Sequence, residues 1–183
     1  MFRRGVIVAI SGVDGSGKTS IIDGVRKNLS ARGVESRCVW LRYNHYLTKL
    51  VLAFCRFTGL TRYEYSESAR AVYHEFYRSR IVSWLFVAST WIDTAVTSLV
   101  LVHIPSLFSK RLIICDRWVY DIMVDLEVDT RISFSQRSTP GVWFKKLVPR
   151  GTRYFLIVRN YDTVRQARDE SGMDRNFPTR YSL

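Results

Sequence analysis

Apolar residues occur along the chain in short β-branched runs and in longer stripes at helical spacing, and the two patterns alternate. The short runs predict four β-strands, at residues 6–10, 37–41, 111–115 and 153–158. The stripes predict helices at residues 19–30, 47–57, 121–126 and 162–170, and a short helix with Thr139 as N-cap and Pro140 in its first turn. Strands that alternate with helices favour one parallel sheet with helices on both faces. The predicted fold class is therefore α/β with three layers.

A long helix is predicted from residue 67 to about residue 102, with Ser66 or Ser68 as its N-cap. The most apolar part of the chain, residues 81–108, overlaps this helix and is long enough to cross a membrane. Asp93 lies near the middle of that stretch, where a charge is costly in lipid. A buried core helix explains the composition as well, and we expect no membrane association.

The length and charge of the chain set limits on its partners. The 183 residues suffice for one α/β domain with a full core, and we expect a single domain over residues 1–183. The net charge is +12, and 22 of the 28 basic residues are arginine. Arginine suits two-pronged contacts to phosphate groups, but the same charge fits a solvated basic surface. A nucleic-acid partner is compatible with this composition without being favoured by it.

The three cysteines, Cys38, Cys55 and Cys115, lie far apart and show no spacing typical of a zinc site. An odd number of scattered cysteines indicates free thiols in a reducing compartment. The first predicted strand begins close to Met1, which leaves no room for a signal peptide. We therefore expect a cytoplasmic protein.

A glycine-rich loop lies between the first predicted strand and the first predicted helix. Residues 12–19 spell Gly-Val-Asp-Gly-Ser-Gly-Lys-Thr, which is the phosphate-binding pattern of a P-loop, or Walker A motif. In such a loop the backbone amides converge on one anion, and the N-terminus of the following helix adds to the attraction. Lys18 supplies a cation for the outer phosphates and Thr19 a hydroxyl ligand for Mg²⁺, so ATP and Mg²⁺ are the predicted ligands. The predicted ATP-binding residues are Gly12, Val13, Asp14, Gly15, Ser16, Gly17, Lys18, Thr19 and Ser20.

Two other predicted strands also end in polar residues. The carboxyl ends of parallel strands meet at the edge of the sheet where ligands bind. The second strand leads into Arg42, and the third leads into Asp116 and Arg117. Asp116 is a candidate for holding Mg²⁺ or positioning an attacking oxygen, and Arg117 for binding a phosphate. The alternative is a local ion pair that closes the end of the strand, but the nearby P-loop favours the functional interpretation.

From about residue 6 to residue 168, the chain resembles the thymidylate kinases, a family of P-loop nucleoside monophosphate kinases. The resemblance rests on the loop at residues 12–20 with its internal Asp14, and on the strand that ends in Asp-Arg-Trp at residues 116–118. Further matches are the segment at residues 85–91, the proline-led fourth strand at residues 149–158, and the arginines between residues 165 and 168.

The resemblance implies transfer of the γ-phosphoryl group of ATP to a nucleoside monophosphate, with dTMP to dTDP as the expected reaction. It implies that Lys18, Asp116, Arg117 and Arg168 are the catalytic residues, with Arg165 as a less secure second lid arginine, and that Thr19 and Asp116 hold the metal. It also implies an acceptor site in which Asp14 contacts the sugar, Phe86 stacks on the base and Arg117 binds the phosphate, with Arg42 and Thr90 beside them. A lid around residues 159–176 and a homodimer formed through the long apolar helix are further expectations of the resemblance.

Several positions depart from the family pattern. Thr90 stands where the family has a phosphate-binding arginine, and Arg42-Tyr-Asn-His45 replaces Arg-Glu-Pro-Gly. The family's last strand and closing helix are not recognisable before Leu183. Two alternatives therefore stay open, namely a thymidylate-kinase-like enzyme with another acceptor, and a P-loop ATPase or nucleic-acid-binding protein that is not a kinase.

Overall fold

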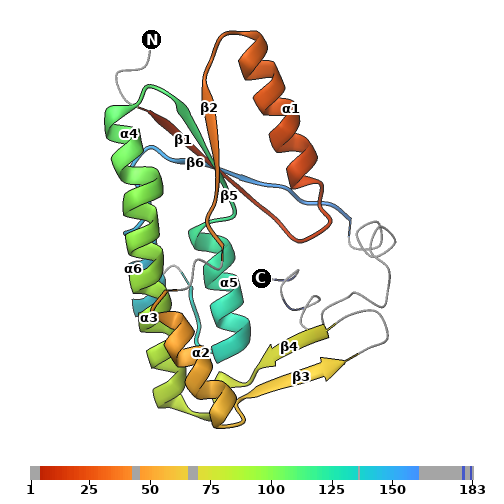
Figure 1. The fold of residues 1–183 in the computed structure, drawn as a ribbon, viewed down its shortest axis with the longest axis vertical. Coiled ribbons are helices and arrows are strands. Elements are labelled where there is room, and N and C mark those ends of the chain that lie inside the picture. Colours follow the sequence, from red (N-terminus) through yellow and green to blue (C-terminus); the bar gives the residue numbers. More distant parts are fainter. Residues whose placement is uncertain are drawn as a thin grey trace.

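A parallel sheet of four strands forms the centre of the molecule. The computed structural model describes residues 5–42, 46–65, 70–135 and 137–160, together with residues 179 and 182. Within these ranges, the side chains of residues 62–73 are not described. The strands are β1 (Val6–Ser11), β2 (Ser36–Trp40), β5 (Leu112–Asp116) and β6 (Arg153–Leu156). They lie in the order β2-β5-β1-β6, and every neighbouring pair is parallel (Figure 1). The four predicted strands are confirmed.

Alternate residues of each strand point to opposite sides of the sheet, and core residues lie on both faces. On β1, Ile7 and Ala9 join the larger core cluster, whereas Ile10 joins the smaller one together with Ile22 of α1 (Lys18–Ala31). The remaining helices lie on the side of the larger cluster (Figure 1). They are α2 (Thr48–Phe57), α3 (Arg80–Ser98), α4 (Ile104–Phe108), α5 (Val119–Thr130) and α6 (Thr139–Lys145), with a short 3₁₀ turn η1 (Phe76–Arg78) before α3. The predicted three-layer α/β class is confirmed.

The long helix begins later than the sequence pattern predicts. The chain before it instead forms two antiparallel strands, β3 (Thr61–Tyr65) and β4 (Arg70–His74), in which Thr61 pairs with His74. The prediction was wrong because the polar composition of this segment hid the alternating Thr and Tyr residues that favour a strand. The N-cap of α3 is Ser79, whose hydroxyl accepts a hydrogen bond of 3.4 Å from Val82 N. The predicted caps, Ser66 and Ser68, lie outside the described residues.

Two other helix ends differ from the prediction. From Ser98 the long helix continues through a π-helical turn, η2 (Leu99–His103), into α4, so it ends at residue 108 and not near 102. The N-cap of α6 is Ser138 and not Thr139, because the Ser138 hydroxyl accepts a hydrogen bond from Gly141 N at 3.2 Å. A serine hydroxyl at the N-cap satisfies one of the amides that the first turn of a helix leaves without an intrahelical partner.

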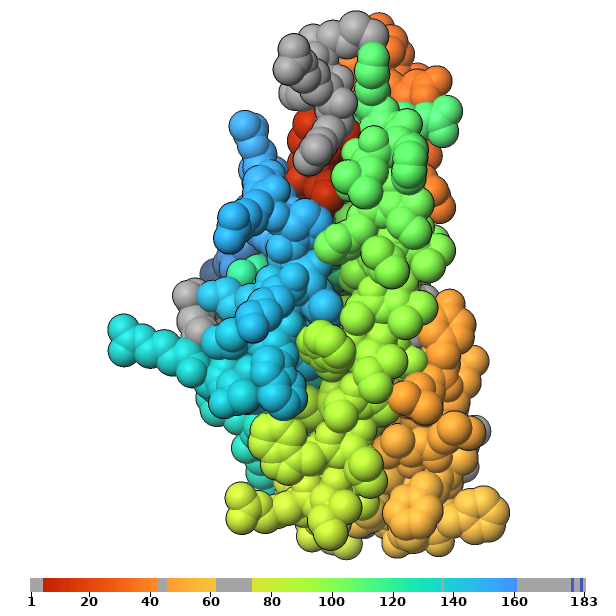
Figure 2. All heavy atoms as spheres, turned by 90° about the vertical axis from the view of Figure 1, so that its left-hand side faces the viewer, coloured from red at the N-terminus to blue at the C-terminus, as the bar shows by residue number. Residues whose placement is uncertain are grey.

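The α3 helix buries polar side chains and exposes apolar ones. Its buried polar residues are Ser83, Ser89, Thr90, Asp93, Thr94, Thr97 and Ser98. The large apolar residues exposed along α3, η2 and α4 include Ile81, Leu85, Ile92, Val96, Leu99, Ile104 and Leu107. Figure 2 shows this continuous helix crossing one face of the molecule, beside α2. The helix also buries Val82, Phe86 and Val87, so apolar residues occur on both its buried and its exposed side.

Asp93 has a structural role within α3. Its carboxylate accepts three hydrogen bonds of 2.9 Å, from the backbone N–H groups of Tyr46, Leu47 and Thr48, where α2 begins. Burial favours the neutral acid, but these hydrogen bonds outweigh it and hold the pKa of Asp93 below its ordinary value. The helix from Arg80 to Phe108 is long and apolar enough to cross a membrane by length and composition, yet half of its apolar window is buried inside the fold. A core helix with a buried charge at its middle accounts for this composition.

Candidate functional site

The P-loop connects β1 to α1 in a conformation that only glycines adopt without strain. Gly12, Gly15 and Gly17 have φ angles of 148°, 85° and 91°. A Cβ atom at Gly12 would also lie 2.5 Å from the carbonyl oxygen of Ile157, so the chain after β6 leaves no room for a side chain there. The N-cap of α1 is Gly17, which has no side chain to bond the first amides of the helix. These amides suit an anionic ligand.

Lys18 is folded back onto its own loop. Its Nζ donates a hydrogen bond of 2.6 Å to the carbonyl oxygen of Val13 and lies 3.5 Å from Ser16 Oγ. Burial and the neighbouring Arg117 lower its pKa to about 8, although nearby carboxylates act in the opposite direction. Burial removes the water that would otherwise stabilise the ammonium charge of Lys18. A phosphate would stabilise this charge in place of that water.

Asp116 ends β5 beside the P-loop and offers an oxygen for a metal ion. Its Oδ1 is buried and has no hydrogen-bond partner in the described part of the chain. Burial raises the pKa of Asp116, against the opposing effect of Arg117 and Lys18. A buried carboxylate oxygen without a partner fits a Mg²⁺ ligand. Among the described residues, no group of three His, Cys, Asp or Glu side chains surrounds a metal position, so a bound Mg²⁺ would take its other ligands from Thr19, phosphate and water.

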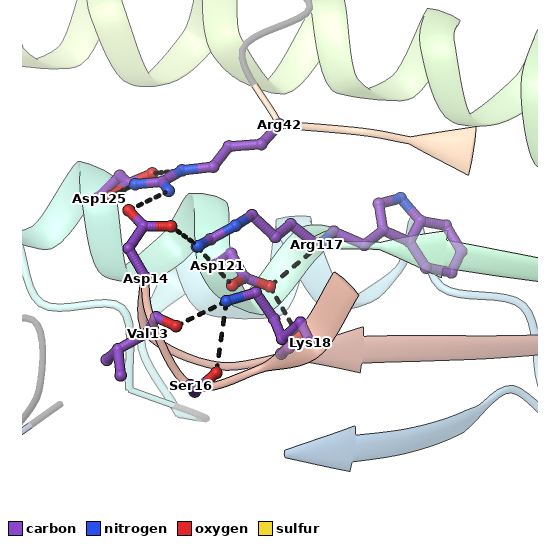
Figure 3. A network of polar contacts seen from close by, with 10 residues as sticks. Val13, Asp14, Ser16, Lys18, Arg42, Arg117, Asp121 and Asp125 are labelled. Carbon is purple, nitrogen blue, oxygen red and sulfur yellow. Dashed lines mark hydrogen bonds and ion pairs between the residues drawn. The ribbon is translucent and has the colours of Figure 1, made fainter. Parts of the chain in front are cut away.

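Arg117 reaches from the end of β5 to the P-loop. It has a φ of 57°, which is unusual for a residue with a side chain, and its backbone N–H donates to the carbonyl oxygen of Ile10 at 3.0 Å. Its guanidinium forms an ion pair with Asp14 and lies 3.4 Å from a carboxylate oxygen of Asp121 (Figure 3). A strained backbone that is held by a sheet contact is typical of a functional position.

Arg42 approaches the same carboxylate from the end of β2. Its NH1 lies 3.6 Å from Asp14 Oδ2, while Nε and NH2 donate to the two oxygens of Asp125 at 2.7 and 2.8 Å. Asp14 therefore lies between two guanidinium groups, as Figure 3 shows. Three residues that the sequence predicts for the acceptor site are thus side by side next to the P-loop.

Two acidic residues of the cluster were not predicted. Asp121 accepts hydrogen bonds from Ser11 Oγ at 2.6 Å and from Trp118 N at 3.2 Å, so it joins the end of β1 to the start of α5. Asp125 follows one helical turn later and pairs with Arg42. The spacing of four residues on one helix, directly after Asp-Arg, was the available signal.

The other predicted site residues lie away from the cluster around Asp14 or outside the described residues. Phe86 on α3 is only 5% exposed, and its ring centroid lies 4.3 Å from that of Phe76 in the core. The Thr90 hydroxyl, also on α3, is buried without a hydrogen-bond partner in the described part of the chain. Ser20 is exposed in the first turn of α1. Arg165, Arg168 and nearly all of the predicted lid and last helix lie outside the described residues. The roles of these residues stay predictions.

Comparison with known proteins gives a likeness at the level of the fold. No protein-family model and no curated protein matches the sequence. Among solved structures, the thymidylate kinase from Candida albicans is similar with a TM-score of 0.53 and 17% identity, over 98% of this chain and 75% of that chain. The chain has the α/β fold of the P-loop NTPases. The thymidylate kinase from Ehrlichia chaffeensis matches with a TM-score of 0.45 and 16% identity, over 89% of this chain and 83% of that chain.

Proposed function

We propose that this protein is an ATP-dependent nucleotide kinase, a phosphotransferase that moves the γ-phosphoryl group of ATP to a nucleoside monophosphate, and that dTMP is its acceptor. The observation that carries the proposal is the convergence of Arg42 and Arg117 on Asp14, directly beside the P-loop. Two arginines next to a donor-phosphate loop are the arrangement that a second phosphate group requires. The fold shared with thymidylate kinases supports the same class of reaction.

The donor half of the site would hold the triphosphate of ATP. The first amides of α1, which Gly17 leaves without a side-chain cap, would bind the phosphates, and Lys18 would exchange its bond to Val13 for a phosphate oxygen. Asp116 and Thr19 would hold Mg²⁺, which supplies positive charge to the phosphate oxygens when bound. These groups orient the γ-phosphoryl group and neutralise the charge that develops on it.

The acceptor half would hold a phosphate monoester. Such a dianion attracts both guanidinium groups more strongly than one carboxylate does, so it can displace Asp14 from Arg42 and Arg117. An acceptor phosphate is already a good nucleophile, and the reaction depends on positioning more than on a general base. Arg168 is the residue we propose to close over the transferring group, and Phe86 and Thr90 are those proposed beside the acceptor base.

A second candidate is a kinase of the same class with another acceptor. It is favoured by Thr90, which stands where the family has a phosphate-binding arginine and whose buried hydroxyl has no hydrogen-bond partner in the described part of the chain. A P-loop ATPase or nucleic-acid-binding protein that is not a kinase is the third. The net charge of +12 would then serve the nucleic acid.

We also propose a homodimer in the cytoplasm. The exposed apolar residues of α3, η2 and α4 form a surface whose contact with water is unfavourable. The same face of a second copy would cover it symmetrically. The three cysteines are free thiols, which fits a reducing compartment.

The experiment that tests the proposed function measures ADP formation from ATP and Mg²⁺ with a panel of nucleoside monophosphates. ADP should form only when one acceptor, dTMP first, is present. Equal ATP hydrolysis without any acceptor would contradict the kinase proposal. ADP formation that depends on a nucleic acid would favour the third candidate.

A further inference from the structure

Arg42 has two carboxylate partners that differ in their surroundings. Asp125 contacts two nitrogens of its guanidinium at 2.7 and 2.8 Å, and both side chains of this pair are largely buried. Asp14 contacts the third nitrogen at 3.6 Å, and its side chain is 46% exposed. The guanidinium is therefore held on one side by a two-pronged pair, and on the other by a longer contact with a solvated loop residue.

The two pairs differ in how readily they exchange. A planar two-pronged contact fixes the orientation of a guanidinium, and its removal would take away the close ion pair that this buried cation forms with Asp125. A single longer contact to a half-exposed carboxylate is weak, because water and salt screen it. An incoming anion would therefore replace Asp14 and leave Asp125 in place.

Asp125 lies on α5, and the same helix carries Asp121, which contacts Arg117. Asp121 and Asp125 are one turn apart on α5, and they contact Arg117 and Arg42 respectively. Asp121 is itself fixed by Ser11 Oγ and by the backbone N–H of Trp118. The helix thus contacts both guanidinium groups, Arg117 through Asp121 and Arg42 through Asp125, as Figure 3 shows.

We propose that Asp125 is a positioning residue, which keeps Arg42 directed at the P-loop while the phosphate of the acceptor replaces Asp14. The inference rests on the proposed function, because it assigns Asp125 to the acceptor half of that site. Asp125 touches neither substrate nor the transferred group; it acts through Arg42. Asp14 is then the anion that the acceptor phosphate replaces.

The two carboxylates give opposite expectations for the same substitution. Asp14→Asn removes the anion that competes with phosphate, so phosphate should bind more tightly. Asp125→Asn removes the support of Arg42, so phosphate should bind about tenfold more weakly even though a negative charge has been lost. A purely electrostatic effect would tighten binding in both variants, and this difference in sign separates positioning from charge.

The test is a titration with inorganic phosphate, followed by the NMR signal of the Arg42 Nε–H group, which the Arg42→Lys variant assigns. The wild-type signal should move as phosphate replaces Asp14, and half-saturation should shift in opposite directions in Asp14→Asn and Asp125→Asn. Asp23→Asn, which removes one exposed charge on α1, is the matched control and should behave as wild type. Phosphate binding by Asp125→Asn that equals or exceeds that of wild type would overturn the proposal.

A second variant and a kinetic measurement complete the test. Asp125→Glu keeps the charge and lengthens the side chain, so it should give an intermediate loss of phosphate affinity if Asp125→Asn does not fold. In transfer assays the KM for the acceptor should rise about tenfold in Asp125→Asn while the KM for ATP stays within about twofold of wild type. Absence of transfer in the wild type would contradict the proposed function, whereas the phosphate titration would still decide the role of Asp125.

Discussion

The guanidinium of Arg117 forms an ion pair with the carboxylate of Asp14, across 103 positions of the sequence. This contact joins the carboxyl end of β5 to the P-loop, so a phosphate bound at Arg117 would lie next to the phosphates bound by the loop. The proposed transfer depends on this relationship, because two anions must be held close together against their mutual repulsion.

The protonation of Lys18 should limit ATP capture at alkaline pH. Its pKa is lowered to about 8, chiefly by burial. The amine of Lys18 is positively charged below that pH and loses its charge above it. The kcat/KM for ATP should therefore fall by about tenfold per pH unit beyond pH 8 to 9. Lys18→Arg keeps its charge at these pH values and, if it retains transfer, should lack this decline. A flat alkaline profile in the wild type would contradict the assignment.

Substitution by alanine should lower the free energy of unfolding at Gly12 and raise it at Gly24. Gly12→Ala places a Cβ 2.5 Å from the Ile157 carbonyl oxygen at a φ of 148°, and should destabilise the fold by about 1–3 kcal/mol. Gly24→Ala lies within α1 with no atom near its Cβ, and should stabilise by about 0.5–1 kcal/mol. Urea denaturation measures both. A neutral Gly12→Ala variant would contradict the close approach of the chain after β6.

Asp93 should make stability depend on acidic pH. Its pKa in the fold lies below the ordinary value of 3.8, because hydrogen bonds from the start of α2 overcome the effect of burial. Its contribution is therefore present above pH 3.8 and is lost as the pH falls through the lowered value. Asp93→Ala should cost about 1–3 kcal/mol at pH 7 in urea denaturation, since the amides that it caps lose their partner. Asp23→Asn, an exposed acid on α1, should change little.

Charge on the apolar face of α3 should separate the proposed dimer. Val96 is 50% exposed on this face, and Ile92 lies one turn before it. Val96→Glu would place an unpaired carboxylate in the contact, so light scattering should record a dimer for wild type and a monomer for the variant. Val34→Glu, at an exposed apolar residue before β2, should remain dimeric. A wild-type monomer at high protein concentration would contradict the proposal.

The sequence predicts those parts of the fold that rest on local patterns. The four strands are short, mainly apolar runs, of which β1 and β5 are the most buried, and the glycines at residues 12, 15 and 17 indicate the loop directly. The hairpin of β3 and β4 was missed because its pairing, and not its hydrophobicity, defines it. The capping of α2 by Asp93 was missed because it depends on the packing of two helices, although the charge itself was noticed.

The candidate site divides in the same way. Arg42 and Arg117 were predicted from their places at the ends of strands, which parallel strands bring together, and Asp14 from the P-loop motif and the family resemblance. The pair of Arg42 and Asp125 joins residues 83 positions apart through the packing of α5, and no local pattern specifies it. Their functional roles stay predictions until they are measured.

Transfer of label from ATP tests the central claim most directly. The protein is mixed with Mg²⁺, dTMP and ATP labelled in its γ-phosphate, and the nucleotides are separated after one turnover. The account predicts labelled dTDP in stoichiometric amount with wild type, a loss of about 100-fold or more with Lys18→Ala, and wild-type behaviour with Lys27→Ala on the exposed side of α1. Label that appears only as inorganic phosphate, or transfer that survives in Lys18→Ala, would contradict it.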